Sequence, residues 1–268
     1  MCEPSVNRRN FVSQNQNQIV AMTPEKILFY LLPLFAFIFV VNAVLPKGFV
    51  YLDQIDSTIV QEVIYYGNQS FVGRQLAGFK APKVILTKIA AIKLKKIQAN
   101  IRKDNYSLVI YDGYRPSKAL KDFIRWRDEP DSATKKYYHP YLTKKEVFEY
   151  AYCTPTSGHS RGSTVDITLI ELGMTLNPNP KPIKRQLNDG RWIYRLDDNT
   201  VDMFTSVDVM DPASWGNSTL FDKIYQEHRN YLHRKMAMYG FFPYAIEWWH
   251  FTLIDEPFKN TFFDFDIE

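Results

Sequence analysis

Two short segments of the chain contain the residue types that bind a metal ion and use it for hydrolysis. The first runs from Ser157 to Asp166 and reads Ser-Gly-His-Ser-Arg-Gly-Ser-Thr-Val-Asp, and the second runs from Glu247 to His250 and reads Glu-Trp-Trp-His. Together they supply two histidines and two carboxylates, which a three-ligand zinc site with a general base requires. The sequence therefore predicts a hydrolytic metal centre.

The four residues can be assigned to separate roles in such a centre. A catalytic zinc ion has three imidazole or carboxylate ligands and keeps one position open for water, whose pKa it lowers to about 7. His159, Asp166 and His250 can supply the three ligands for one ion. Glu247 precedes His250 by three residues, and its carboxylate can take a proton from the attacking water and pass it to the leaving amine.

Each segment also has a simpler interpretation. The residues around His159 could be a polar loop, and the second segment could be a strand with a buried aromatic face. Because the chain contains only five histidines, their presence in both segments favours the metal site. The composition from 241 to 253 predicts a strand, on which residues three apart point to opposite faces. A bulge or a strong twist near Trp248 is then needed to bring Glu247 and His250 together.

In these segments the chain resembles the D-alanyl-D-alanine dipeptidases of the vancomycin-resistance type. Those proteins are zinc enzymes of a wider fold group that also holds the D,D-carboxypeptidases and the hedgehog signalling domain. The resemblance runs from about Phe49 to the C-terminus. Besides the metal segments it rests on Tyr111-Asp112-Gly113-Tyr114-Arg115-Pro116, on Asp202-Met203 followed by Asp208, and on Asp255-Glu256-Pro257.

The resemblance implies roles for five residues. It makes His159, Asp166 and His250 zinc ligands, Glu247 the general base and acid, and Arg115 the residue that stabilises the tetrahedral intermediate. A fixed guanidinium aimed at the developing oxyanion contributes more in the transition state than in the ground state. From the hexapeptide alone, the preferred interpretation of Arg115 is a surface arginine in a turn.

Two further residues are implied to contact the substrate. The family's matching serine lines the substrate site, although Ser157 could equally hydrogen-bond the loop backbone. Asp208 could hold the free ammonium of a dipeptide, because a buried carboxylate is the natural partner of that charge. The same stretch departs from the family pattern: Phe204 replaces a glycine and Val207 replaces a phenylalanine. Bulk at Phe204 could reshape the pocket.

The implied activity is zinc-dependent hydrolysis of D-alanyl-D-alanine, or a similar small D,D-dipeptide, in cell-wall peptide metabolism. One alternative is a D,D- or L,D-carboxypeptidase that acts on longer peptidoglycan peptides, which loops closing the pocket around a dipeptide would disfavour. Another alternative is a non-catalytic zinc-binding module. The presence of both Glu247 and Arg115 argues against that module, because metal binding alone requires neither.

Composition and periodicity predict one α+β domain over residues 44–268. The chain has 268 residues, is 46% hydrophobic and carries a net charge of +4, which is enough for one core and gives no indication of nucleic-acid binding. We expect helices over 86–101, 117–126 and 220–232, strands over 108–111 and 165–170, and a surface loop over 173–200. The expected fold is a small antiparallel sheet that carries the zinc site, flanked by helices.

Residues 1–43 are predicted to be a signal peptide or a membrane anchor. The stretch 27–45 is apolar and long enough to span a membrane, but it ends in Val41-Asn42-Ala43, which resembles a signal-peptidase site. Met22 would start a signal of more usual length. We therefore expect export to the periplasm, with an inner-membrane anchor as the alternative, and contact with the membrane only through this segment.

Overall fold

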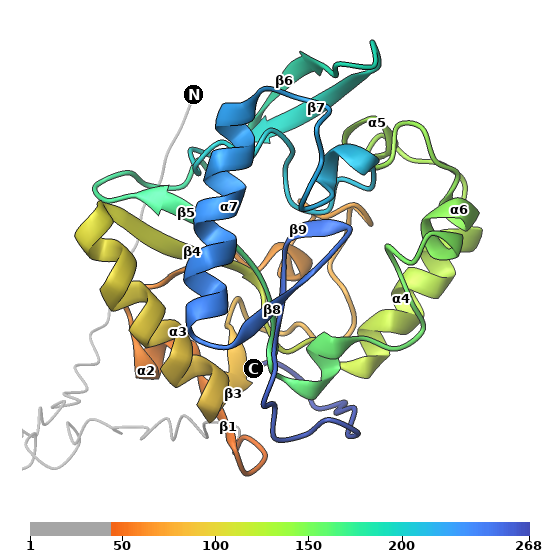
Figure 1. Ribbon diagram of the computed structural model, residues 1–268. Helices are drawn as coiled ribbons and strands as arrows, with labels where there is room; N and C mark the ends of the chain where they lie inside the picture. The colour runs from red at the N-terminus through yellow and green to blue at the C-terminus, as the bar shows by residue number, and fades with distance from the viewer. Residues whose placement is uncertain (1–43) are drawn as a thin grey trace, which may run out of the picture. The chain divides into compact units, whose positions relative to one another are not determined.

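The computed structural model describes residues 44–268, which form a mixed α+β fold (Figure 1). The expected α+β class is thus confirmed. The signal peptide or anchor predicted for residues 1–43 lies outside the described residues. Within 44–268, every helix is too short or too polar to cross a membrane.

A five-stranded sheet in the order β2-β4-β5-β9-β8 forms the centre of the fold. Its strands are β2 (Val60–Gln61), β4 (Tyr106–Asp112), β5 (Thr164–Glu171), β9 (Glu247–Leu253) and β8 (Phe241–Tyr244). The sheet is mixed where we expected it to be antiparallel, because β2 pairs with β4 in parallel while the other pairs are antiparallel. Side chains of β5 are buried on both faces except at Glu171, including those of Thr164, Asp166 and Thr168.

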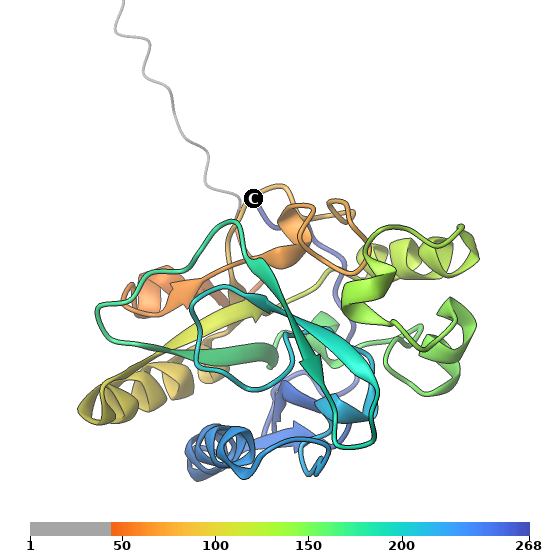
Figure 2. The same cartoon turned by 90° about the horizontal axis from the view of Figure 1, so that it is seen from above.

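Helices α3 (Lys88–Ile101) and α7 (Lys223–Met238) lie next to each other on one side of this sheet (Figures 1 and 2). Helix α3 buries Leu94, Ile97 and Ile101, which recur at helical spacing. The helix predicted for 220–232 begins later, at Lys223, because Asp222 is extended and acts as its N-cap residue. The predicted helix at 117–126 is α4 (Ser117–Asp128).

Two predictions of local structure were wrong in detail. The segment 241–253 is a hairpin, not one strand, because the chain turns between Tyr244 and Glu247. Its pairing shifts register between Pro243 and Tyr244, which leaves β9 residues 248–250 opposite no residue of β8. The predicted loop 173–200 contains a second hairpin, formed by β6 (Lys181–Gln186) and β7 (Trp192–Asp197).

Shorter elements complete the fold of residues 44–268. A two-stranded sheet pairs β1 (Phe49–Tyr51) with β3 (Ile85–Thr87). The remaining helical segments are α2 (Leu52–Ile55), η1 (Ile64–Tyr66), η2 (Arg102–Asp104), α5 (Lys135–Tyr138), α6 (Lys144–Glu149), η3 (Gly158–Arg161) and η4 (Pro212–Ser214).

Candidate metal centre and active site

The sheet register brings two of the predicted ligands together. Asp166 on β5 lies directly opposite His250 on β9, and on its other side it lies opposite Asp112 on β4. His159 comes from the short helical turn η3 that precedes β5. The chain returns from this turn at Gly162, whose φ of +79° favours glycine. A side chain there would also be obstructed, since a Cβ would lie 2.2 Å from Phe49 Cε1.

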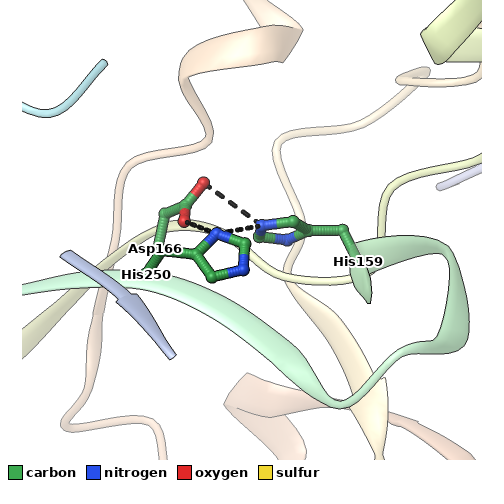
Figure 3. Close-up of side chains that lie close together, drawn as sticks. All are labelled: His159, Asp166 and His250. Carbon is green, nitrogen blue, oxygen red and sulfur yellow. Dashed lines mark hydrogen bonds and ion pairs between the residues drawn. The ribbon is translucent and has the colours of Figure 1, made fainter. Parts of the chain in front are cut away.

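The three predicted ligands converge on one point (Figure 3). Each offers one ligand atom, and these atoms all lie within 4.8 Å of one another. His159 Nε2 is 3.4 Å from Asp166 Oδ2 and 3.4 Å from His250 Nδ1, and His250 Nδ1 is 3.1 Å from Asp166 Oδ1. Two imidazoles and one carboxylate within this distance can hold one divalent ion.

The surroundings of these three residues fit a zinc ion. His159 Nδ1 lies 2.7 Å from the Gly113 carbonyl oxygen; a proton on Nδ1 leaves the Nε2 lone pair free for a metal. Apart from its 3.1 Å contact with His250 Nδ1, Asp166 Oδ1 is buried without a hydrogen-bond partner among the described residues. Burial alone would raise the pKa of Asp166, but His159 and His250 outweigh it and lower that pKa, so the carboxylate is charged. Nitrogen and oxygen donors of this kind are ordinary zinc ligands.

Glu247 lies beside the predicted ligands and its side chain is buried. Its Oε2 is 3.4 Å from His250 Nδ1. The register shift within the β8–β9 hairpin accounts for this position, because it displaces the start of β9 from a regular ladder. The irregularity expected near Trp248 is thus present. Burial, followed by the charges of Asp166 and Asp208, raises the pKa of Glu247 well above its usual value, which makes it a stronger base.

Arg115 is also buried, and it lies next to Asp166. Its Nε donates to Asp112 Oδ2 at 2.7 Å, and an Nη atom lies 3.5 Å from Asp166 Oδ2. The guanidinium also lies 4.8 Å from the centre of the Tyr65 ring. Burial opposes its charge, but these carboxylates and Tyr65 more than compensate and raise the pKa of Arg115. It is therefore a fixed cation and not a surface arginine.

Asp208 faces the same space. Its Oδ2 accepts a hydrogen bond of 2.8 Å from the Tyr65 hydroxyl, and its φ is +64°. Burial, reinforced by Asp166, raises the pKa of Asp208 to about 7. An ammonium ion beside the carboxylate would lower that pKa again, since an opposite charge favours the ionised form.

Ser157 is the N-cap residue of η3, and its hydroxyl accepts a hydrogen bond of 3.2 Å from the His159 backbone N–H. This bond is the simpler of its two expected roles. Ser157 also lines the pocket, so the structure is compatible with contact to substrate.

The predicted site residues surround one cavity of about 240 Å³. All seven residues predicted to act in catalysis, metal binding or substrate binding line it: Arg115, Ser157, His159, Asp166, Asp208, Glu247 and His250. The structure shows their proximity, while their individual roles remain predictions.

The other histidines make structural contacts. A ring nitrogen of His228 lies 2.7 Å from the Asp202 carbonyl oxygen, one of His233 lies 3.1 Å from that of Trp248, and one of His139 lies 3.1 Å from that of Leu142. None of the three belongs to the group of possible metal ligands found among the described residues. Cys153 is buried and forms no disulfide within residues 44–268.

Sequence reasoning missed two residues of the site. Asp112 belongs to the hexapeptide quoted above, but its role became visible only when the structure placed it against Arg115 and 3.3 Å from His159 Nδ1. Tyr65 carries no motif at all; its hydroxyl and ring connect Asp208 with Arg115. Its position depends on long-range packing, which spacing in the sequence does not report.

Comparisons with known proteins identify the family of this chain. A peptidase M15 family model, described as D-ala-D-ala dipeptidase, matches residues 46–177 and 193–268. A D-alanyl-D-alanine dipeptidase of Enterococcus faecalis is 31% identical over 225 residues, covering 83% of this chain and 100% of the relative. One of Streptomyces coelicolor is 32% identical over 220 residues, covering 82% of this chain and 98% of the relative.

Solved structures give a much weaker likeness. VanYB in complex with D-Alanine-D-Alanine covers 66% of this chain and 75% of its own, with a TM-score of 0.34 and 14% identity. The family model and the sequence relatives, each matching most of residues 44–268, are decisive: the chain belongs to the D-ala-D-ala dipeptidase family of M15 peptidases.

Proposed function

We propose that this chain is a zinc-dependent dipeptidase that hydrolyses D-alanyl-D-alanine or a similar small D,D-dipeptide. The observation that carries the proposal is the convergence of two histidines, three carboxylates, an arginine and a serine on one cavity of about 240 Å³. Family membership supplies the expected substrate class, and the donor set supports one zinc ion at His159, Asp166 and His250.

The residues around the cavity, together with the zinc ion that they would hold, supply the groups that amide hydrolysis requires. When bound, zinc supplies a Lewis acid that polarises the scissile carbonyl and lowers the pKa of water. Glu247 removes the proton of the attacking water and delivers it to the departing amine. Arg115, held by Asp112, donates hydrogen bonds to the carbonyl oxygen as it becomes an anion.

Asp208 and the pocket walls favour a dipeptide over a longer chain. The carboxylate of Asp208 can receive the substrate's ammonium group, which a dipeptide has close to its scissile bond and a longer peptide does not. On the outer side, the Tyr244 hydroxyl donates to the Ala151 carbonyl at 3.2 Å, and the Trp215 indole N–H donates to the Tyr152 hydroxyl at 3.0 Å. The first bond joins two segments that line the cavity, and the second ties the lining residue Tyr152 to a neighbouring segment.

For the cellular role, we propose export to the periplasm by residues 1–43 and a part in recycling wall peptides. The support is the apolar sequence of residues 27–45, which fits a secretory signal or an anchor.

The test is alanine release from D-Ala-D-Ala by protein starting at Val44, with and without a chelator, beside a longer peptide ending in D-Ala-D-Ala. We expect chelator-sensitive release from the dipeptide, restored by zinc. Release from the longer peptide instead would establish a carboxypeptidase, and zinc binding without turnover of either substrate would contradict the proposed activity.

A further inference from the structure

The hairpin β6–β7 contacts the loop that carries Asp208. The family model matches residues 46–177 and 193–268, so β6 and the turn after it lie outside the matched residues. Figure 1 shows the hairpin extending from the same side of the molecule as the start of α7. Its contacts with the loop 202–208, called here the Asp208 loop, indicate what this hairpin does.

The hairpin holds alternate residues of the Asp208 loop. Arg185 on β6 donates to Asp202 Oδ1 at 2.7 Å and to the Phe204 carbonyl at 3.3 Å. Two residues further on, the Ser206 hydroxyl accepts a hydrogen bond of 2.7 Å from the Leu196 backbone N–H on β7. The next residue in this alternation is Asp208, which faces the active-site cavity.

Phe204 joins the loop to the hairpin through apolar packing. It belongs to a second hydrophobic cluster, separate from the main core, that consists of Leu187, Ile193, Phe204, Ala213 and Phe221. Its ring stacks on Phe221 at 4.6 Å between centroids, and the Arg185 guanidinium lies 5.3 Å from its ring centre. Leu187 follows β6 and Ile193 lies on β7, so the hairpin supplies part of this cluster.

The intervening residues of the loop face the body of the domain. Met203 and Val207 pack into the main core, and the Thr205 hydroxyl accepts a hydrogen bond of 2.8 Å from the Trp248 indole. The loop is therefore held between the hairpin and the residue that follows Glu247.

The backbone of the loop needs such support. Phe204 has a φ of +70° and Asp208 a φ of +64°, and non-glycine residues adopt this left-handed region at an energetic cost that surrounding contacts must offset. At Phe204 the offsetting contacts come largely from Arg185 and the second cluster.

We propose that the β6–β7 hairpin is a clamp that fixes the Asp208 loop, so that the Asp208 carboxylate selects substrates with a free ammonium group. Arg185 and Phe204 are its positioning residues. This inference rests on the proposed role of Asp208 as the partner of the dipeptide ammonium, and it assigns a specificity function to a hairpin whose first strand lies outside the residues matched by the family model.

The test compares Arg185→Ala and Arg185→Lys with Lys184→Ala as the matched control. Lys184 is the neighbouring, exposed residue of β6, and its ammonium lies over Trp192 instead of the loop. For each zinc-loaded variant, kcat and KM are measured on D-Ala-D-Ala and on N-acetyl-D-Ala-D-Ala, which lacks the ammonium. Amide hydrogen exchange of residues 203–208 is measured in parallel.

For Arg185→Ala we expect KM for D-Ala-D-Ala to rise about 10-fold with kcat changed less than about 3-fold, because ammonium binding contributes equally to the ground and transition states. The preference over the N-acetyl substrate should fall by a similar factor, and exchange in 203–208 should accelerate. Arg185→Lys should recover part of both effects, since lysine keeps the charge but loses the two-pronged contact with Asp202.

Unchanged substrate preference or unchanged exchange in Arg185→Ala, relative to Lys184→Ala, would overturn the clamp. A uniform loss of activity on both substrates would also overturn it, since that result signifies general destabilisation. If the wild-type protein does not cleave D-Ala-D-Ala, the proposed function fails on its own, and the exchange data still decide whether the hairpin orders the loop.

Discussion

Asp166 and His250 lie directly opposite each other on neighbouring antiparallel strands, with Asp166 Oδ1 3.1 Å from His250 Nδ1. A slip of one residue between β5 and β9 would turn one of the two side chains to the other face of the sheet. The strand register is thus what places two predicted ligands side by side, and the turn at Gly162 adds the third.

Replacing Asp166 by asparagine should remove metal binding while preserving shape. We expect zinc affinity to fall by at least about 100-fold, since even residues that only orient ligands contribute 10- to 100-fold. Zinc content after dialysis against a zinc buffer measures this, and the rise in Tm on adding zinc should disappear with it. Thr168→Val is the matched control on the same strand, because the buried Thr168 hydroxyl has no hydrogen-bond partner within the described residues. Normal zinc content in Asp166→Asn would contradict the assigned ligand set.

Glu247→Gln should separate metal binding from turnover. The amide keeps the size of the side chain but cannot accept the proton of the attacking water, so kcat should drop by about 100- to 10,000-fold. Zinc content should stay at the wild-type level, because Glu247 is not among the three convergent ligands. Full activity in this variant would exclude Glu247 as the general base.

Gly162→Ala should destabilise the domain by about 2 to 4 kcal/mol, because overpacking adds to left-handed backbone strain. The added Cβ would lie 2.2 Å from Phe49 Cε1 at a φ of +79°. Gly173→Ala is the control, since its φ is +89° but nothing lies within 4 Å of the added atom. Denaturant unfolding of both variants measures the difference. Equal losses would show that backbone strain, and not the contact with Phe49, limits this turn.

Protonation of His139 should make the domain less stable in mildly acidic solution. The side chain is fully buried, and burial lowers its pKa because the charged imidazole is disfavoured there. The folded state then binds fewer protons than the unfolded state, so this contribution is present above the unfolded pKa of about 6.5 and is lost as the pH falls. We expect the drop in Tm between about pH 7.5 and pH 5.5 to be smaller in His139→Phe than in the wild type. An identical drop in both proteins would show that His139 is not linked to stability.

The sequence by itself determined the chemistry of the candidate site. Histidine and carboxylate types at 159, 166, 247 and 250 predicted a hydrolytic metal centre, because a three-ligand zinc site with a general base uses these groups together. Local periodicity also identified α3, α4 and the central strands, since burial of one side of an element imposes a regular spacing on its apolar residues.

Only the tertiary structure decided how these residues meet. The register shift that places Glu247 beside His250, the contact of Asp112 with Arg115 and the approach of Tyr65 to Asp208 all join segments distant in sequence. The β6–β7 hairpin was missed because exposed, charged residues predict a loop unless a partner strand is known. Such contacts depend on which elements pack together, and that is a property of the whole fold, whereas spacing along the chain reports only its local part.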